Sequence, residues 1–225
     1  MNEAALFTER RLANFSGRAG GVCSVPMLWL VLAALVLVRA LPAGAQQEQT
    51  RPAQPTFVYL TPDEALQEAF PKAARFRVDT LRLSLEQRRA LAKKLRQPEL
   101  DSLFIVHLAY NAEGHFLGYA TIMNEVGKYE PITFVVGVDP RFRVKKVAVM
   151  VYRESRGGQV RQPRFLYQFR NKSARDPLQP GRDIINISGA TLSVRAISRG
   201  VKKALHILSF WYGTHPPQGG RRSEP

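Results

Sequence analysis

The spacing of apolar residues changes twice along the chain and divides it into predicted elements. Two short segments, beginning near residues 62 and 84, have helical spacing. The long segment from 102 to 155 is rich in Val, Ile, Phe and Tyr, and helical spacing returns after residue 191. Residues 156–182 are basic and irregular, with RFLYQF as a short helix or strand. This order of elements predicts an α+β fold, an antiparallel β-meander packed with helices.

Each of the first two helices has a clear start. Thr61 suits the N-cap, Pro62 the first helical position and Glu64 the third position of a capping box, and Pro71 ends the helix. Its expected inward residues are Ala65, Leu66, Ala69 and Phe70. The second helix is predicted to begin near Ser84, with Leu85, Leu91 and Leu95 inward and Arg88, Arg89, Lys93 and Lys94 outward.

The middle segment predicts four or five antiparallel strands, because turn signals interrupt it at regular intervals. The turns are expected at Asn111–Gly114, at Gly127-Lys128 and at Asp139-Pro140. Basic residues alternate with apolar ones in its last third, namely Arg141, Arg143, Lys145 and Lys146. Such alternation is typical of a sheet with one face in water.

The last helix is predicted from about residue 192 to residue 212. One apolar stripe runs along it, made of Val194, Ile197, Val201, Leu205 and Leu208. The basic residues lie largely off that stripe, at Arg195, Arg199, Lys202 and Lys203.

The first 45 residues resemble an export signal. The apolar run Leu28–Val38 follows Arg10, Arg11 and Arg18, and Ala43 with Ala45 supplies the small residues of a cleavage site. The run is shorter than the roughly 20 residues that span a bilayer, although an uncleaved anchor stays an alternative. We therefore expect a signal peptide at 1–45, a linker at 46–57, an N-terminal helical segment at 58–100, the main domain at 101–212 and a disordered tail at 213–225. The mature protein is expected outside the cytoplasm, in the periplasm or on the outer face of the cytoplasmic membrane.

The net charge of +15 predicts an anionic partner. The basic residues are spread along the chain without an arginine-rich arm or a nucleic-acid-binding motif, so we expect no nucleic acid partner. A solubilising role, or proximity to anionic lipid, explains the charge equally well. The single cysteine, Cys23, excludes an internal disulfide, and the four histidines lack ligand spacing, so no metal site is expected. No catalytic constellation is apparent.

A small polar run, Ser188-Gly189-Ala190-Thr191, stands where the last helix begins. Helix N-termini attract phosphate, Gly189 permits a close backbone approach, and Ser188, Thr191 and Ser193 add hydroxyls. The run is a candidate phosphate site, with a plain helix cap at Ser188 or Thr191 as the alternative.

Three motifs in this order resemble the extracytoplasmic FMN-binding domain family. Ser188-Gly189-Ala190-Thr191 is similar to the family's [ST]-G-A-T, and Glu154-Ser155-Arg156-Gly157 to its E-T-x-G turn after a long strand. Pro131-Ile132-Thr133-Phe134, leading into Val138-Asp139, is similar to its central hairpin. The family includes the covalently flavinylated subunits of sodium-pumping NADH:quinone reductases and of Rnf-type complexes. The resemblance covers residues 100–208 and implies an FMN-binding-domain-like fold.

The resemblance implies FMN as a cofactor, joined to the Thr191 hydroxyl through a phosphoester bond that a flavin transferase makes. Backbone N–H groups from Gly189 through Ala190 and Leu192 to Ser193 are then expected at the phosphate, and Glu154, Ser155 and Gly157 at the ring. Thr133 of the hairpin is a further expected cofactor contact. The sequence departs from the family at Ile185, because the family usually has an aspartate three residues before its Ser/Thr, and the nearest acid here is Asp183.

These features favour an electron carrier over an enzyme that turns over its own substrate. The expected partner is a redox protein that is acidic or membrane-bound. Two alternatives stay open: a non-redox accessory protein that binds an anionic ligand or membrane surface in the same basic cleft, and an FMN-dependent reductase with a small-molecule acceptor.

Overall fold

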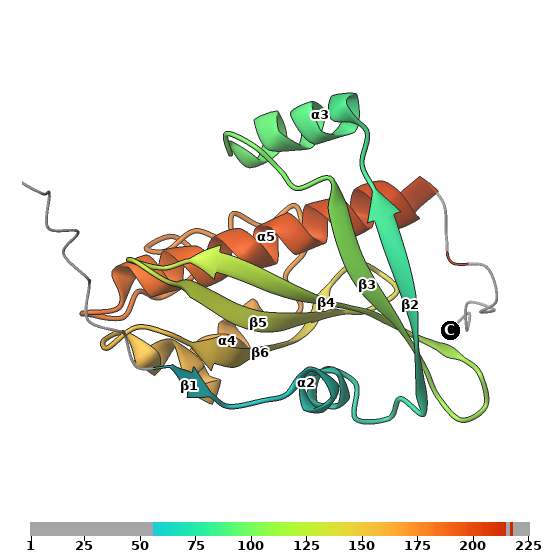
Figure 1. The fold of residues 1–225 in the computed structure, drawn as a ribbon, viewed down its shortest axis with the longest axis horizontal. Coiled ribbons are helices and arrows are strands. Elements are labelled where there is room, and N and C mark those ends of the chain that lie inside the picture. The colour runs from blue at the N-terminus through green and yellow to red at the C-terminus, as the bar shows by residue number, and fades with distance from the viewer. Residues whose placement is uncertain (1–55, 215–216, 218–225) are drawn as a thin grey trace, which may run out of the picture. The chain divides into compact units, whose positions relative to one another are not determined.

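A computed structural model describes residues 56–214 and 217, which form a single six-stranded antiparallel sheet with helices on both faces (Figure 1). The strand order is β1-β6-β5-β4-β3-β2. The strands are β1 (Phe57–Val58), β2 (Arg75–Arg82), β3 (Leu103–Tyr110), β4 (Phe116–Val126), β5 (Pro131–Val138) and β6 (Val144–Tyr152). The helices are α2 (Pro62–Ala69), α3 (Leu85–Leu95), α4 (Pro163–Leu166) and α5 (Thr191–Thr214), with 3-10 turns η2 (Gly158–Arg161) and η3 (Tyr167–Phe169). The predicted α+β class and the antiparallel meander, β3 to β6, are confirmed.

Both predicted helix starts are confirmed as capping boxes. The Thr61 hydroxyl accepts a hydrogen bond from the Glu64 N–H, and the Glu64 carboxylate accepts one from the Thr61 N–H. Ser84 and Gln87 form the same reciprocal pair at α3. Leu85 was predicted inward and is exposed instead. It stands six residues before Leu91, and at 3.6 residues per turn this spacing puts the two side chains on different faces of the helix.

The prediction that one face of the sheet is exposed to water is wrong for the centre of the sheet. In β5 the adjacent Val135 and Val136 are both fully buried, since α2 covers one face and α5 the other (Figure 1). Phe70 lies in the α2-side core and reaches a close contact with the backbone at Gly118. Of the basic residues that suggested a wet face, Arg141 and Arg143 lie in the turn between β5 and β6, and Lys145 and Lys146 lie in β6 near the sheet edge.

The segment 58–100, predicted as helical, holds α2 and α3 with β2 between them. β2 pairs with β3 along its whole length, from Arg75 opposite Tyr110 to Arg82 opposite Leu103. At the other end of the chain α5 continues to Thr214, two residues beyond the predicted end. The predicted signal peptide, most of the linker, and the tail apart from residues 213, 214 and 217 lie outside the described residues. Within the described ranges, no helix has the length and apolar character needed to cross a membrane.

A buried carboxylate fixes α5 on the sheet. Glu125 of β4 accepts a hydrogen bond from Arg199 Nε at 2.6 Å and pairs with Lys203 Nζ. Gly200 permits this approach, because a Cβ there would stand 2.5 Å from the Phe134 ring and 2.8 Å from Glu125 Cγ. The stripe predicted for α5 is confirmed as core. Two of the basic residues predicted beside the stripe, Arg199 and Lys203, therefore serve the packing of the helix.

Candidate functional site

The turn after β6 packs directly against the start of α5. The Tyr152 hydroxyl donates a hydrogen bond to the Arg156 carbonyl at 2.5 Å and shares another with Ser193 Oγ at 3.0 Å. Gly157 has a φ of +93°, and a Cβ on it would lie 2.5 Å from Tyr152 Oη and 2.8 Å from Ser193 Oγ. The two motifs that the sequence separates by about thirty residues are thus brought into contact.

The start of α5 leaves backbone N–H groups available. The Val194 N–H bonds to the Ala190 carbonyl, so the preceding N–H groups of the first turn have no acceptor inside the helix. Ala190 itself has no side chain that accepts a hydrogen bond. Asn186 Nδ2 donates to Thr191 Oγ1 at 3.0 Å and fixes that half-buried hydroxyl at the helix entrance. This geometry suits an anion near Thr191.

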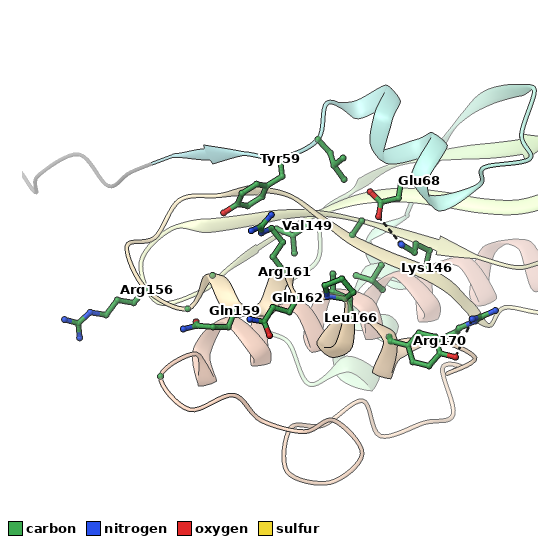
Figure 2. Close-up of a pocket in the computed structure, with 18 of the residues that line it drawn as sticks. Tyr59, Glu68, Lys146, Val149, Arg156, Gln159, Arg161, Gln162, Leu166 and Arg170 are labelled. Carbon is green, nitrogen blue, oxygen red and sulfur yellow. Dashed lines mark hydrogen bonds and ion pairs between the residues drawn. The ribbon is translucent and has the colours of Figure 1, made fainter.

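A cavity of about 1010 Å³ opens beside these two motifs (Figure 2). β6 from Lys145 to Val149 forms one side of it, Tyr59, Leu60 and Glu68 a second, and the segment from Ser155 through η2 and α4 to Arg170 a third, with Gly189 at its margin. The lining is basic: Lys145, Lys146, Arg156, Arg161 and Arg170 stand against the single acid Glu68. Figure 2 shows Arg156 directed away from the other labelled residues.

The basic side chains of the lining pack mainly on aromatic rings. The Arg161 guanidinium lies 4.3 Å from the centre of the Tyr59 ring, and Lys145 Nζ lies 4.7 Å from that of Phe70. Partial burial lowers the pKa of Lys145, although the charge of Asp139 acts in the opposite direction. Lys146 Nζ pairs with Glu68 at 3.0 Å. The cavity therefore combines planar apolar surfaces with net positive charge.

Three of the predicted site residues, Ser155, Gly157 and Gly189, line this cavity. Gly189 has a φ of +77° and no atom within 4 Å of the position that a Cβ would take, so its backbone is open to a ligand. The remaining predicted residues of the α5 entrance do not line the cavity. Ser188 and Leu192 are exposed, Thr191 is half-buried, and Ala190 and Ser193 are buried.

Glu154 and Thr133 occupy structural positions away from the lining. Glu154 Oε1 accepts backbone N–H bonds from Lys128, Tyr129 and Glu130 and so holds the turn between β4 and β5. Thr133 Oγ1 donates to Asn124 Oδ1 at 2.7 Å and accepts from Arg153 Nη1 at 3.0 Å. Contact of either residue with a cofactor stays a prediction.

Asp183 does not replace the missing motif aspartate. Its carboxylate accepts hydrogen bonds from the Gln179 and Leu178 N–H groups and pairs with Lys172 Nζ at 2.9 Å. Partial burial acts to raise the pKa of Asp183, but these hydrogen bonds together with the Lys172 charge outweigh it and lower the pKa below its ordinary value. Ile185 exposes 75% of its surface, and its N–H donates to Gln168 Oε1.

The sequence did not predict Tyr59, Arg161 and Arg170 as site residues. They come from three separate segments, and no local motif marks any of them. Lys145 and Lys146 were noticed in the sequence, but as part of a solvated sheet face. The only sequence signal for Tyr59 is its own aromatic side chain, two residues before the N-cap Thr61.

The residues present fit FMN. The open backbone at Gly189 and the free N–H groups of the α5 entrance suit its phosphate. The cavity lies at the upper end of the size range of small-molecule sites, and the Tyr59 ring with the Arg161 guanidinium over it forms part of its lining. Its net positive lining complements a phosphorylated ligand.

The match to a family model supports the same cofactor. Residues 127–206 match the model of the family described as FMN-binding domain. Among solved structures, NqrC of Shewanella oneidensis is similar, with 16% identity, coverage of 60% of this chain and 80% of that chain, and a TM-score of 0.44. No curated protein matches. The predicted resemblance to this family is confirmed by the match over 127–206.

Proposed function

We propose that this protein is an extracytoplasmic flavoprotein electron carrier whose FMN is joined to Thr191 by a phosphoester bond. The observation that carries the proposal is the contact between the Gly157 turn and the α5 entrance, beside a basic cavity. The Thr191 hydroxyl already stands at that entrance, where it accepts a hydrogen bond from Asn186. The FMN-binding family match over 127–206 supports the choice of cofactor.

The residues of the α5 entrance would hold the phosphate. N–H groups of the first turn of α5 would donate to it, and Gly189 would leave room for it. The Asn186 amide orients the Thr191 hydroxyl. FMN, when bound, supplies the uptake and release of electrons, while the protein contributes position and electrostatics. Lys145, Arg161 and Arg170 contribute positive charge, which stabilises added negative charge and thereby raises the midpoint potential.

The proposed location and partners rest on the sequence. Residues 1–45 have the pattern of an export signal, and attachment at Thr191 calls for a flavin transferase. The net charge of +15 favours encounter with an acidic or membrane-bound redox partner, and this attraction weakens as ionic strength rises.

The absorption spectrum of the purified protein, recorded before and after addition of dithionite, tests the flavoprotein proposal. The protein is co-produced with a flavin transferase and exported. We expect a yellow protein whose flavin bands bleach with dithionite and return in air. A colourless protein would contradict the proposal and favour the accessory-protein alternative. Sustained turnover of a small-molecule acceptor by the yellow protein would instead favour a reductase.

The substitution Ile185→Asp is expected to speed covalent attachment of FMN. It supplies the carboxylate that the FMN-binding domain family usually has at this position. Asp183 does not take that role, because its carboxylate pairs with Lys172 and accepts hydrogen bonds from two backbone N–H groups. The exposed Ile185 side chain leaves room for the change without loss of core packing. In-gel flavin fluorescence over a time course of co-production with the transferase measures the rate.

The matched control for this experiment is Ile185→Asn, which has a similar shape and no charge. We expect a faster rate for the aspartate variant alone. Equal rates in wild type and both variants would contradict a role of the carboxylate at this position.

A further inference from the structure

The strand β2 forms the edge of the sheet opposite β1, and its outer side is unpaired along its whole length (Figure 1). In the part of the chain that the structure describes, β3 is the one strand that pairs with β2. Five of its eight residues are exposed and only Leu81 is buried. The exposed residues are Arg75, Arg77, Val78, Thr80 and Arg82. This edge is therefore accessible to another strand.

The backbone groups on the outer side of β2 belong to alternate residues. The Leu83 N–H bonds to the carbonyl of Ser102, which stands opposite it in the register of β2 with β3. The direction of these groups alternates along an antiparallel strand, so the other odd-numbered residues of β2 also direct theirs to β3. The N–H and C=O groups of Phe76, Val78 and Thr80 therefore point outward, where an added strand would bond to them.

An apolar surface beside this edge is left uncovered. Val78, in the middle of β2, exposes 60% of its surface, and Ile105 and Leu103 of β3 expose 56% and 49%. These residues share one face of the sheet, since Ile105 stands opposite Thr80 and Leu103 opposite Arg82. A strand added to β2 would extend this face and shield Val78 from water.

The charges of β2 fit a second copy of the same strand in one register. Opposite charges that face each other across an antiparallel pair stabilise it, and like charges destabilise it. With Val78 opposite Val78 of the second copy, Arg77 of each strand faces Asp79 of the other, and Arg75 faces the uncharged Leu81. The two neighbouring registers that also match the outward backbone groups would place Arg77 opposite Arg77, or Asp79 opposite Asp79.

We propose that this protein forms a homodimer in which two β2 strands pair antiparallel about Val78 and join the two sheets into one. Phe76 of one copy then lies opposite Thr80 of the other, in the same cross-strand row as Ile105, and extends over the exposed apolar face. The dimer needs no flavin. It also leaves the cavity beside β6 free, because β3, β4 and β5 separate β6 from β2.

Sedimentation equilibrium of the full-length exported protein, produced without a flavin transferase, measures dimerisation over a range of protein concentrations. We expect wild type to dimerise and Val78→Pro to dimerise at least about tenfold more weakly, because proline removes both central hydrogen bonds of the new pair. The β2–β3 ladder does not use this N–H, so the substitution spares it. The matched control is Val78→Thr, which retains the N–H and the branched shape and is expected to stay within about threefold of wild type.

The register is tested by disulfide formation in a Cys23→Ser background. The two Val78 Cα atoms of the proposed pair would stand about 5.5 Å apart, within the range that a disulfide bridges. The two Thr80 residues would be offset by four positions, about 13 Å along the strands. We expect rapid formation of a disulfide-linked dimer by Val78→Cys and little by Thr80→Cys.

Charge reversal tests the contact between Arg77 and Asp79. Arg77→Asp would place two carboxylates opposite each other at two symmetric positions, and we expect it to weaken dimerisation roughly tenfold. Its control is Arg82→Asp, which changes the net charge equally but faces the uncharged Ala74 of the second copy, and it is expected to preserve dimerisation.

The proposal is overturned if wild type stays monomeric at every concentration. Slow exchange of the Phe76, Val78 and Thr80 amides in such a monomer would assign the edge to another segment of the same chain. The proposal is also overturned if Val78→Pro dimerises like wild type, if the two cysteine variants cross-link at equal rates, or if the two charge variants weaken dimerisation alike.

Discussion

Gly157→Ala is expected to destabilise the protein by roughly 3 kcal/mol. A left-handed backbone costs a residue with a Cβ about 1–2 kcal/mol. The new Cβ would stand 2.5 Å from Tyr152 Oη and 2.8 Å from Ser193 Oγ, so it would separate the two hydroxyls that join β6 to α5. Loss of that buried hydrogen bond adds a further 1–3 kcal/mol. The midpoint of urea unfolding measures the change.

Gly181→Ala is the matched control for this prediction. Gly181 has a φ of +81°, close to that of Gly157, and no atom lies within 4 Å of the position that its Cβ would take. Its substitution carries the backbone cost alone, about 1 kcal/mol. If the two variants lose the same stability, the contact between the turn and the α5 entrance does not contribute as described.

Lowering the pH from 6.5 to 4 is expected to reduce the free energy of unfolding through His206 by about 3 kcal/mol. Burial in α5, together with the charges of Lys94 and Lys202, lowers the pKa of His206 to about 4. In the unfolded chain the imidazole takes up a proton near its ordinary value of about 6.5. Between these two values only the unfolded chain is protonated, so stability falls as pH falls; below 4 both states hold the proton and the loss is complete.

The measurement compares urea unfolding of wild type and His206→Leu across this pH range. Burial also lowers the pKa of His107, and its contribution cancels because both proteins retain it. The difference in stability between the two proteins is expected to shift by about 3 kcal/mol in favour of the leucine variant as the pH falls. Exposed His115→Gln is the control. A constant difference between wild type and His206→Leu would contradict the buried neutral state of His206.

Local signals in the sequence predicted the elements well where one short motif specifies a structure. The capping boxes at Thr61 and Ser84 and the apolar stripe of α5 are of this kind. β2 was missed although Phe76 and Val78 alternate with Arg75 and Arg77, the period of a strand. The alternation is short and strongly charged, and it is stabilised as a strand by pairing with β3, a contact with a segment more than twenty residues away.

The site was predicted only in its linear parts. The motifs at Ser155–Gly157 and at Gly189 were found because each is contiguous, and the structure adds that they pack against each other through Tyr152 and Ser193. The cavity itself depends on tertiary structure. Tyr59, Lys145 and Arg161 meet because β1 leaves β6 early and η2 turns back beneath the sheet edge, and neither event has a marker in the sequence.

The intact mass of the exported protein, co-produced with a flavin transferase, tests whether FMN is attached at Thr191. Wild type is measured beside Thr191→Ala and Thr191→Ser, since serine retains the hydroxyl. We expect an added mass of one FMN less one water in wild type and in the serine variant, and none in the alanine variant. An unmodified wild-type protein, or the same added mass in Thr191→Ala, would contradict Thr191 as the site of attachment.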